Sequence, residues 1–442
     1  MNYNEAVEYL YNSRPPFHIV GSTAYKPGLD NMLRLMAHMG NPHERLQAVH
    51  VAGTNGKGST CHLIASVLQA AGLKVGLYTS PHLVSLTERI RINGLPVPEQ
   101  EVADFVTRHQ AFLDEIQPSF FETVTALAFG YFAAQQVDIA VIETGLGGRL
   151  DSTNVITPLL SVITNIGMDH TEFLGSTLPR IAREKAGIIK PNIPCVIGET
   201  HPQTMNTFLD RARECGILGQ GLETTDCRIW FADQCGYMRR RRLREAPECD
   251  LKGLYQEQNM QTAFVALQVL RNYSFANNGH HISRQAISDG FAHVSARTGL
   301  RGRWETLRTE PLIICDTGHN SHGIQYVARQ LKELTHPHVW IVFGMVSDKD
   351  TEVVMRLLPA KNRYSYIFTT PNSKRARSAQ QMLDLWNSAH PSPVTDAPSA
   401  TAIDKPEEAI RYALTHASPE DAVFIGGSNY LVGEAIQIIQ QI

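Results

Sequence analysis

The stretch Val51-Ala52-Gly53-Thr54-Asn55-Gly56-Lys57-Gly58-Ser59-Thr60 decides the fold. An apolar run at 46–52 leads into it and predicts a strand, and a helical pattern from about 59 to 71 follows it. In a strand–turn–helix of this kind, backbone N–H groups and the helix N-terminus can surround an anion. Lys57 adds a positive charge suited to the β- and γ-phosphates of a nucleotide, and the hydroxyls can approach phosphate or Mg²⁺. The stretch therefore predicts a phosphate-binding loop.

The common nucleotide-binding pattern G-x-x-x-x-G-K-[ST] fits this loop imperfectly. Val51 stands at the first glycine position, and Gly58 separates Lys57 from Ser59. This departure points away from GTPases and kinases. A glycine turn that merely starts a helix is the plain alternative interpretation.

Apolar runs alternate with helical patterns along the rest of the chain. Further strands are expected at 74–78, 139–142 and 159–164, and again at 312–315, 339–343, 366–369 and 422–425. Such alternation is typical of parallel sheets covered by helices. Around 296–302 two glycines bracket an arginine, which indicates a linker. We predict an α/β protein with a domain over 1–297, a linker over 298–304 and a smaller Rossmann-like α/β domain over 305–442.

Composition excludes several classes of protein. The net charge of −3 is too small to indicate a nucleic-acid or membrane-surface specialist. The seven cysteines include no C-x-x-C pair, which favours a reducing compartment. The first residues show no secretory signal, and the weakly polar segment 123–137 is shorter than the ~20 residues that span a bilayer. We expect a cytoplasmic protein with a buried helix there, and with neither nucleic acid nor membrane as a partner.

An arginine-rich segment at 238–244 leaves two interpretations open. Five of its seven residues are arginine, which could form an anion-binding patch. A solvated hairpin flanked by Glu245 and Glu248 is the plainer interpretation.

The loop Gly-Thr-Asn-Gly-Lys-Gly-Ser at 53–59 resembles the phosphate loop of the Mur ligase superfamily, in its folylpolyglutamate synthase/dihydrofolate synthase branch. The resemblance continues in order along the chain. It covers Ser80-Pro81-His82-Leu83, Glu88-Arg89-Ile90, Phe121-Glu122, the run from Glu143 to Asn154, Asp169-His170, Leu174-Gly175, the run from Glu184 to Lys190, Tyr255-Gln256, Asn259, Gly302-Arg303-Trp304-Glu305 and Asp316-Thr317-Gly318-His319-Asn320. It implies an N-terminal P-loop ATPase domain with a mainly parallel sheet and a C-terminal Rossmann-like glutamate ligase domain. The implied activity is ATP-dependent ligation of L-glutamate to dihydropteroate, to the γ-carboxylate of folylpolyglutamates, or to both, through an acyl phosphate.

The same resemblance implies the nucleotide site. The implied ATP-binding residues are Gly53, Thr54, Asn55, Gly56, Lys57, Gly58, Ser59, Thr60, Asn259, Arg303, Asp316 and His319. Arg303 suits phosphate oxygens, and Asp316 can accept a hydrogen bond from ribose. His319 and His322 resemble a zinc pair only superficially, because no cysteine or third histidine stands at suitable spacing.

Ser80, Glu143 and His170 each follow a predicted strand end. Because parallel strands end at one edge of a sheet, the three side chains should share one crevice beside the phosphate loop. Each has an ordinary alternative: a turn for Ser80, a helix cap for Glu143 and a buried histidine for His170. By resemblance the three are ligands of Mg²⁺, which prefers oxygen ligands and keeps several waters; a monovalent cation is a further candidate.

Lys185 would otherwise look like a surface lysine of a helix. In the family the matching lysine is carbamylated by CO₂, which turns a cation into a carboxylate-like anion. The reaction needs a neutral amine, so burial or nearby positive charge must lower its pKa. The resemblance assigns catalytic roles to Lys57, Lys185 and His170.

The loop at 147–154 bears on the substrate. Its sequence, Gly-Gly-Arg-Leu-Asp-Ser-Thr-Asn, resembles that of family members that accept dihydropteroate, so we favour a bifunctional enzyme. The residues implied in pterin binding are Tyr25, Lys26, Phe121, Glu122, Leu150, Asp151 and Ser152. We expect a monomer whose partners are small molecules. The alternatives are a monofunctional folylpolyglutamate synthase, a cell-wall Mur ligase, a P-loop motor or switch, and a non-catalytic nucleotide-binding module.

Overall fold

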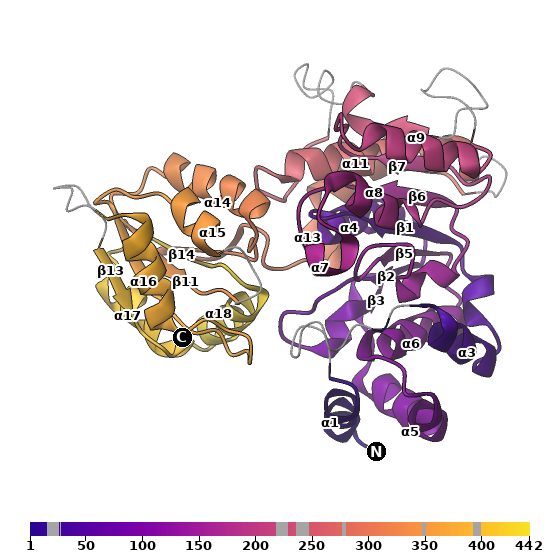
Figure 1. Ribbon diagram of the computed structural model, residues 1–442, viewed down its shortest axis with the longest axis horizontal. Helices are drawn as coiled ribbons and strands as arrows, with labels where there is room; N and C mark the ends of the chain where they lie inside the picture. Colours follow the sequence, from indigo (N-terminus) through magenta and orange to yellow (C-terminus); the bar gives the residue numbers. More distant parts are fainter. Residues whose placement is uncertain are drawn as a thin grey trace. The chain divides into compact units, whose positions relative to one another are not determined.

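The computed structural model describes residues 1–15, 26, 28–217, 229–235, 247–275, 280–346, 351–391 and 399–442. The chain forms two compact units (Figure 1). Unit 1 comprises Met1–Ser80, Leu86–Asp250 and Gln256–Leu300, and unit 2 comprises Pro81–Ser85, Leu251–Tyr255 and Arg301–Ile442. The last change of unit falls between residues 300 and 301, which lie in the predicted linker.

Unit 1 is built on an eight-stranded sheet of order β4-β3-β2-β5-β1-β6-β7-β8. Its strands are β1 (Ala48–Ala52), β2 (Val75–Tyr78), β3 (Ile90–Ile92), β4 (Leu95–Pro96), β5 (Ile139–Glu143), β6 (Leu160–Ile163), β7 (Cys195–Ile197) and β8 (Ile229–Phe231). The six strands from β2 to β8 in this order are parallel, and β3 and β4 form an antiparallel edge. The predicted α/β fold with a mainly parallel sheet is confirmed.

The register brings the carboxyl ends of four strands together. Val51 lies opposite Glu143, and Tyr78 lies opposite Ile142. Ala52 of β1 pairs with the last residue of β6. Segments that follow β1, β2, β5 and β6 therefore emerge along one edge of the sheet.

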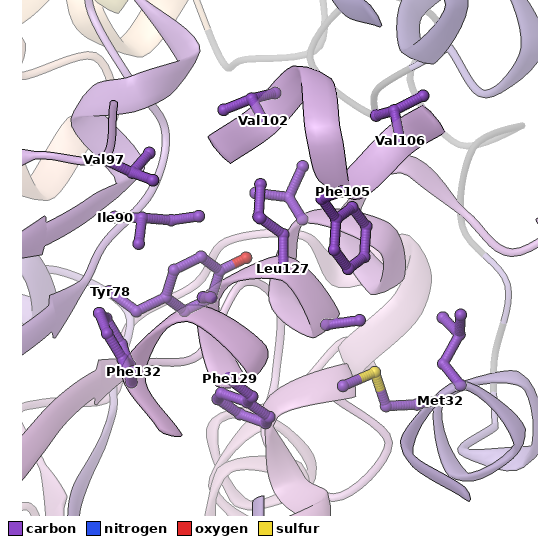
Figure 2. Close-up of a cluster of buried hydrophobic side chains, with 14 of the residues drawn as sticks. Met32, Tyr78, Ile90, Val97, Val102, Phe105, Val106, Leu127, Phe129 and Phe132 are labelled. Atoms are coloured by element: carbon purple, nitrogen blue, oxygen red, sulfur yellow. The ribbon is translucent and has the colours of Figure 1, made fainter. Parts of the chain in front are cut away.

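Helices cover the sheet of unit 1 because their apolar faces need burial. The helices are α1 (Tyr3–Ser13), α3 (Asp30–His38), α4 (Lys57–Ala70), α5 (Glu99–Ile116), α6 (Phe120–Ala134), α7 (Thr171–Leu174), α8 (Leu178–Ala186), α9 (Met205–Glu214), α11 (Gln256–Val269), α12 (Arg284–Ala292) and α13 (Val294–Thr298). Short single turns occur at Pro42–Arg45, Leu86–Arg89, Ser152–Val155, Ala232–Gln234 and Leu270–Ser274. Helices α1, α3, α5 and α6 bury one apolar cluster with residues of β2 and β5, including Tyr78, Phe129 and Phe132 (Figure 2). Helix α4 packs on β1, β2 and β5 and is contacted by α11, α12 and α13.

The segment predicted as a buried helix forms α6, whose first residues include a capping box between Ser119 and Glu122. Among the described residues, no helix combines the length and the apolar character that crossing a membrane requires.

Unit 2 holds a six-stranded sheet of order β13-β12-β11-β14-β10-β9. Its strands are β9 (Glu305–Thr309), β10 (Leu312–Asp316), β11 (Val339–Phe343), β12 (Tyr364–Phe368), β13 (Ser399–Ala402) and β14 (Ala422–Gly426), and only β9 runs antiparallel to its neighbour. Helices α14 (Ser321–Glu333), α15 (Thr351–Leu357) and α16 (Ala379–Ala389) share a core with Ile314 of β10. Helices α17 (Pro406–His416) and α18 (Asn429–Gln441) share another with the adjacent Ile313 and Cys315. Since neighbouring residues of a strand point to opposite faces, the sheet is covered on both sides, as predicted for a Rossmann-like unit.

Candidate active site

The phosphate loop lies between β1 and α4, as the sequence predicted. Gly56 is the N-cap of α4 and has a left-handed conformation, and Lys57 is the first helical residue. The first amides of a helix have no partner within the helix and carry its positive dipole end. The amides from Gly56 to Ser59 are thus suited to bind an anion.

The amides at the start of the loop have a different role. Thr54 N donates to the backbone O of Asn165 at 3.0 Å, and Asn55 N donates to the Oδ1 of the same residue at 2.9 Å. Thr54 Oγ1 exchanges hydrogen bonds with the backbone of Gly167. Thr164 Oγ1 donates to Asn55 O at 2.6 Å. The segment after β6 therefore holds the loop in shape. Asn165 was not predicted, because its only signal in the sequence is its place after a strand.

Two lysines converge on one backbone oxygen of the loop. Lys57 Nζ donates to Gly53 O at 3.0 Å, and Lys185 Nζ donates to the same oxygen at 2.7 Å. Lys185 is 4% exposed. Burial, and then the positive charge of Lys57, lower the pKa of Lys185 to about 7. The structure thus supplies both conditions for a neutral amine, and Lys185 lies beside the phosphate loop and not on the surface.

The expected metal ligands lie at this same edge of the sheet. Glu143 is the last residue of β5, and its Oε2 accepts a hydrogen bond from Ser80 N at 2.9 Å. That oxygen lies 3.5 Å from the position of a Cβ on Gly58, so the carboxylate faces the first turn of α4. His170 is the N-cap of α7, shortly after the residues that hold the phosphate loop, and its backbone N–H donates to Asp169 Oδ1 at 2.9 Å.

These residues fit a nucleotide-bound Mg²⁺ better than a metal held by protein alone. In the described ranges no three His, Cys, Asp or Glu side chains gather closely enough to hold a metal ion, including around His319 and His322. Mg²⁺ bound with nucleotides needs only one or two carboxylates, because phosphate oxygens and waters complete its shell. A carboxylate facing a phosphate-binding helix end meets that need.

Two buried amides of α11 support the loop from the other side. Gln256 Nε2 donates to Ser59 Oγ at 3.2 Å, and Asn259 Nδ2 donates to Gln256 Oε1 at 2.8 Å. The Oδ1 of Asn259 lies 2.1 Å from the position of a Cβ on Gly56, so only glycine fits there. Thr60 is buried, and its hydroxyl has no partner among the described residues. Gln256 belonged to the motif at 255–256 but was not predicted as a site residue.

Phe121 and Glu122, two of the residues predicted to bind the pterin, lie in the first turn of α6. The ring of Phe121 lies 2.6 Å from the position of a Cβ on Gly145. Glu122 forms the capping box with Ser119, and burial raises the pKa of its carboxyl against those hydrogen bonds and the charge of Lys26. Glu122 therefore has a structural role besides the one predicted. Tyr25 lies outside the described residues, as does the arginine-rich segment 238–244.

Asp151 organises the loop that contains it. Its Oδ1 accepts hydrogen bonds from Thr153 N at 3.0 Å and Thr153 Oγ1 at 2.5 Å, and its Oδ2 accepts one from Leu146 N at 2.8 Å. Burial raises the pKa of Asp151 above its usual range. Ser152 beside it is buried, and Leu150 is half-buried. The contact of these three residues with a pterin stays a prediction.

A buried histidine beneath this loop was not predicted. His50 of β1 is fully buried, and its Nε2 lies 2.8 Å from Thr153 Oγ1. Because that hydroxyl donates to Asp151, it must accept from His50, which places the proton on Nε2. Burial lowers the pKa of His50 to about 3, so the ring is neutral.

In unit 2 the predicted residues gather at the end of β10. Asp316 Oδ2 accepts hydrogen bonds from Tyr255 Oη at 2.6 Å and Trp304 N at 2.8 Å, and its Oδ1 accepts one from Gly318 N at 2.7 Å. Burial raises the pKa of Asp316, while the Tyr255 hydroxyl and the charge of Arg303 lower it. His319 Nδ1 lies 2.9 Å from Thr317 O. Tyr255 belongs to the motif at 255–256, but its hydrogen bond to Asp316 was not predicted.

Comparison with known families identifies both units. Residues 51–214 match the Mur ligase middle domain, and residues 302–429 match the Mur ligase glutamate ligase domain. Together the two matches cover more than half of the chain.

Named relatives cover nearly the whole chain. The dihydrofolate synthase/folylpolyglutamate synthase of Bacillus subtilis is 34% identical over 423 residues, which are 92% of this chain and 94% of that protein. The Escherichia coli protein of the same name is 33% identical over 93% of this chain and 91% of its own length. A solved structure of the Escherichia coli enzyme with DHPP and ADP has a TM-score of 0.77 at 28% identity and covers 100% of this chain and 98% of its own.

A bifunctional folylpolyglutamate synthase/dihydrofolate synthase solved with Mn, AMPPNP and L-glutamate has a TM-score of 0.79 at 29% identity, covering 100% of this chain and 98% of its own. The order of motifs, the two domain matches and the full-length relatives agree. The chain belongs to the folylpolyglutamate synthase/dihydrofolate synthase family of the Mur ligase superfamily.

Proposed function

We propose that this chain ligates L-glutamate to dihydropteroate and to the γ-carboxylate of folylpolyglutamates. As a member of this family it is an ATP-dependent ligase that acts on folates. The observation that carries the proposal is the buried amine of Lys185, which lies beside the phosphate loop at the edge of the sheet where β5 ends in Glu143. A simple phosphate-binding loop has no need of such a group.

Amide formation from a carboxylate requires activation. The carboxylate oxygen of the folate attacks the γ-phosphorus of ATP, the bond from that phosphorus to the β–γ bridging oxygen breaks, and an acyl phosphate and ADP result. The glutamate amine then attacks the acyl carbon and loses a proton, and the carbon–oxygen bond to phosphate breaks. Positioning and charge neutralisation are the main tasks of the protein in such a reaction.

The described residues suit these tasks. The amides from Gly56 to Ser59 and the Lys57 ammonium bind phosphate oxygens, for which the helix N-terminus is suited. Asn165 accepts hydrogen bonds from the amides of Thr54 and Asn55 and so fixes the loop before ATP binds. We assign further contacts with ATP to Asn259 in unit 1.

In unit 2 we assign contacts with ATP to Arg303, Asp316 and His319. Three donors hold the Asp316 carboxylate in one orientation, which suits it to accept one further hydrogen bond. The positive charge of Arg303 suits phosphate oxygens.

The divalent metal would be held by Ser80, Glu143 and His170, and when bound it neutralises charge on the transferred phosphoryl group. We propose that Lys185 carries a carbamate, which supplies a further anion at this edge. The burial of Lys185 and its lowered pKa support this assignment.

Substrate range separates two activities of the family. A relative from Lacticaseibacillus casei, 34% identical over 90% of this chain and 94% of its own length, is named folylpolyglutamate synthase alone, so a monofunctional enzyme is the second candidate. Purified protein should be given ATP, Mg²⁺ and labelled glutamate with either dihydropteroate or tetrahydrofolate. We expect dihydrofolate from the first mixture and an extended folate from the second. Product from the second mixture alone would establish the monofunctional enzyme.

A further inference from the structure

Backbone carbonyl groups at the C-terminal end of α8 accept hydrogen bonds from the residues that follow the helix and from the loop at 149–154. The last carbonyl groups of any helix need donors from elsewhere, and Lys185 lies in the last turn of α8. Arg149 N donates to Glu184 O at 2.7 Å, and Asn154 Nδ2 donates to Gly187 O at 3.2 Å. The loop at 149–154 therefore caps the helix that carries Lys185.

Asn154 connects the loop at 149–154 to the C-terminal end of α8 by hydrogen bonds. Its Nδ2 also donates to Arg149 O at 3.0 Å, so one amide group closes the loop and bonds to the helix end. Both acceptors are carbonyl oxygens, which fixes the NH₂ end of the side chain toward them. Its backbone O accepts a hydrogen bond from Lys190 Nζ at 2.8 Å. Asn154 is 6% exposed, so water does not compete for these bonds.

Two glycines show how closely the segments approach. A Cβ on Gly148 would lie 2.8 Å from Lys185 O and 2.9 Å from Glu184 O. A Cβ on Gly187 would lie 2.4 Å from the Cα of Arg149. With no side chain between them, the backbones of the loop and of the helix end are in direct contact.

We propose that Asn154 is a positioning residue for Lys185, whose amine it fixes against the phosphate loop by clamping the loop at 149–154 to the end of α8. The amine bonds to Gly53 O at 2.7 Å, so a displaced helix end would lose that contact. The loop that bears Leu150, Asp151 and Ser152 thus also sets the place of the reactive lysine. This inference rests on the proposed role of Lys185 in the ligation.

The test compares Asn154→Ala and Asn154→Asp with Ser161→Ala. The aspartate keeps the shape of the side chain but turns an oxygen toward the carbonyls of Arg149 and Gly187, which repel it. Ser161 Oγ donates to Ile188 O at 2.8 Å, so its replacement also removes one buried hydrogen bond to the same segment, next to Gly187, but leaves both hydrogen bonds of the Asn154 side chain in place. It controls for a general loss of stability.

Two readouts are needed, both well below the unfolding temperature of each variant. The first is the reaction of Lys185 with a small amine-reactive reagent, carried out at several pH values without substrates and quantified by mass analysis of the peptides. The second is kcat and KM with ATP, glutamate and dihydropteroate. Both Asn154 variants should lower kcat on the order of 10- to 100-fold, as misplaced reacting groups do. KM for dihydropteroate should stay within about twofold, because the lost interaction acts on the chemical step.

The labelling profile of Lys185 should shift in both Asn154 variants and stay unchanged in Ser161→Ala. Adding Asn154→Ala to Lys185→Ala should cost nothing further in kcat. The inference is overturned if Asn154→Ala only lowers the unfolding temperature, or if it raises KM for dihydropteroate at normal kcat. Lys185 labelling needs no turnover, so it decides the inference even if the proposed substrate proves wrong.

Discussion

The amine of Lys185 should react with CO₂ at pH values where an exposed lysine with the ordinary pKa does not. Its pKa is lowered to about 7, first by burial and then by the charge of Lys57. At pH 8 about 90% of such an amine is neutral, against about 0.3% of a lysine with the ordinary pKa of 10.5. Carbamate formation consumes the neutral amine and CO₂ and releases one proton. Lys185 should therefore react on the order of 300-fold faster than an ordinary lysine of equal access at pH 8.

The assay starts from enzyme depleted of CO₂ and adds ¹³C-labelled bicarbonate at several pH values. A carbamate signal should appear in the ¹³C spectrum, and ligation should recover with it. Both should rise with pH through about 7, because protonation of the amine below that value blocks the reaction. Lys405 is the internal reference, since its exposed ammonium is paired with Glu408 Oε1 at 2.7 Å and its pKa is raised.

Substitutions of Lys185 complete the test. Lys185→Ala should be nearly inactive, and acetate or propionate should partly restore it by placing an anion in the vacated space. Lys185→Arg should stay inactive because it keeps a positive charge where a negative one is needed. An active Lys185→Arg enzyme would refute the carbamate, and so would an unmodified lysine in an active enzyme equilibrated with CO₂.

Three further results are expected. Glu143→Ala should keep the fold but lower kcat/KM for ATP on the order of 10²- to 10³-fold at limiting Mg²⁺, and normal turnover there would remove Glu143 from the metal site. The pKa of His50 is lowered to about 3 in the folded chain, so as the pH falls below about 6.5 the unfolded chain takes up a proton that the folded chain does not. The free energy of unfolding therefore decreases as the pH falls below about 6.5. Urea titrations of His50→Leu should show that fall reduced by about 2 kcal/mol between pH 7 and 5, and an unchanged pH dependence would contradict the neutral ring. In CO₂-free buffer at pH 7.5, Lys185→Met should have a free energy of unfolding up to about 4 kcal/mol higher than wild type in urea titrations, because the buried amine disfavours folding until the pH exceeds the pKa of this lysine in the unfolded chain. A variant less stable than wild type would count against the lowered pKa.

Sequence predicted the strands that carry long apolar runs. The strand expected at 339–343 matches β11 without error, and the one at 312–315 misses only Asp316 of β10. The strands that escaped prediction are short or polar. β7 and β8 have three residues each, and β13 reads Ser-Ala-Thr-Ala. Such segments become strands because a neighbouring strand offers hydrogen bonds, which local composition does not reveal.

The site was predictable as a set of residues but not as a set of contacts. The phosphate loop has a local pattern, so sequence located it. The partners of the loop lie far along the chain, and no local pattern links Asn55 with Asn165 or Ser59 with Gln256. Burial of Lys185 depends on the packing of α8 against the loop at 149–154, which only the folded chain determines.

The oxygen shared by Lys57 and Lys185 belongs to the backbone of Gly53. No side-chain replacement removes a carbonyl group, so a point mutation cannot delete this acceptor. Gly53 itself is locked, because a Cβ there would lie 1.8 Å from Thr164 Oγ1. Substitutions that change the positions of Lys57 and Lys185 must therefore lie on the helices that carry them. If the enzyme is evolved in the laboratory toward a new acyl acceptor, Gly53 should stay unchanged, and the substitutions should occur in the residues that pack around α4 and α8.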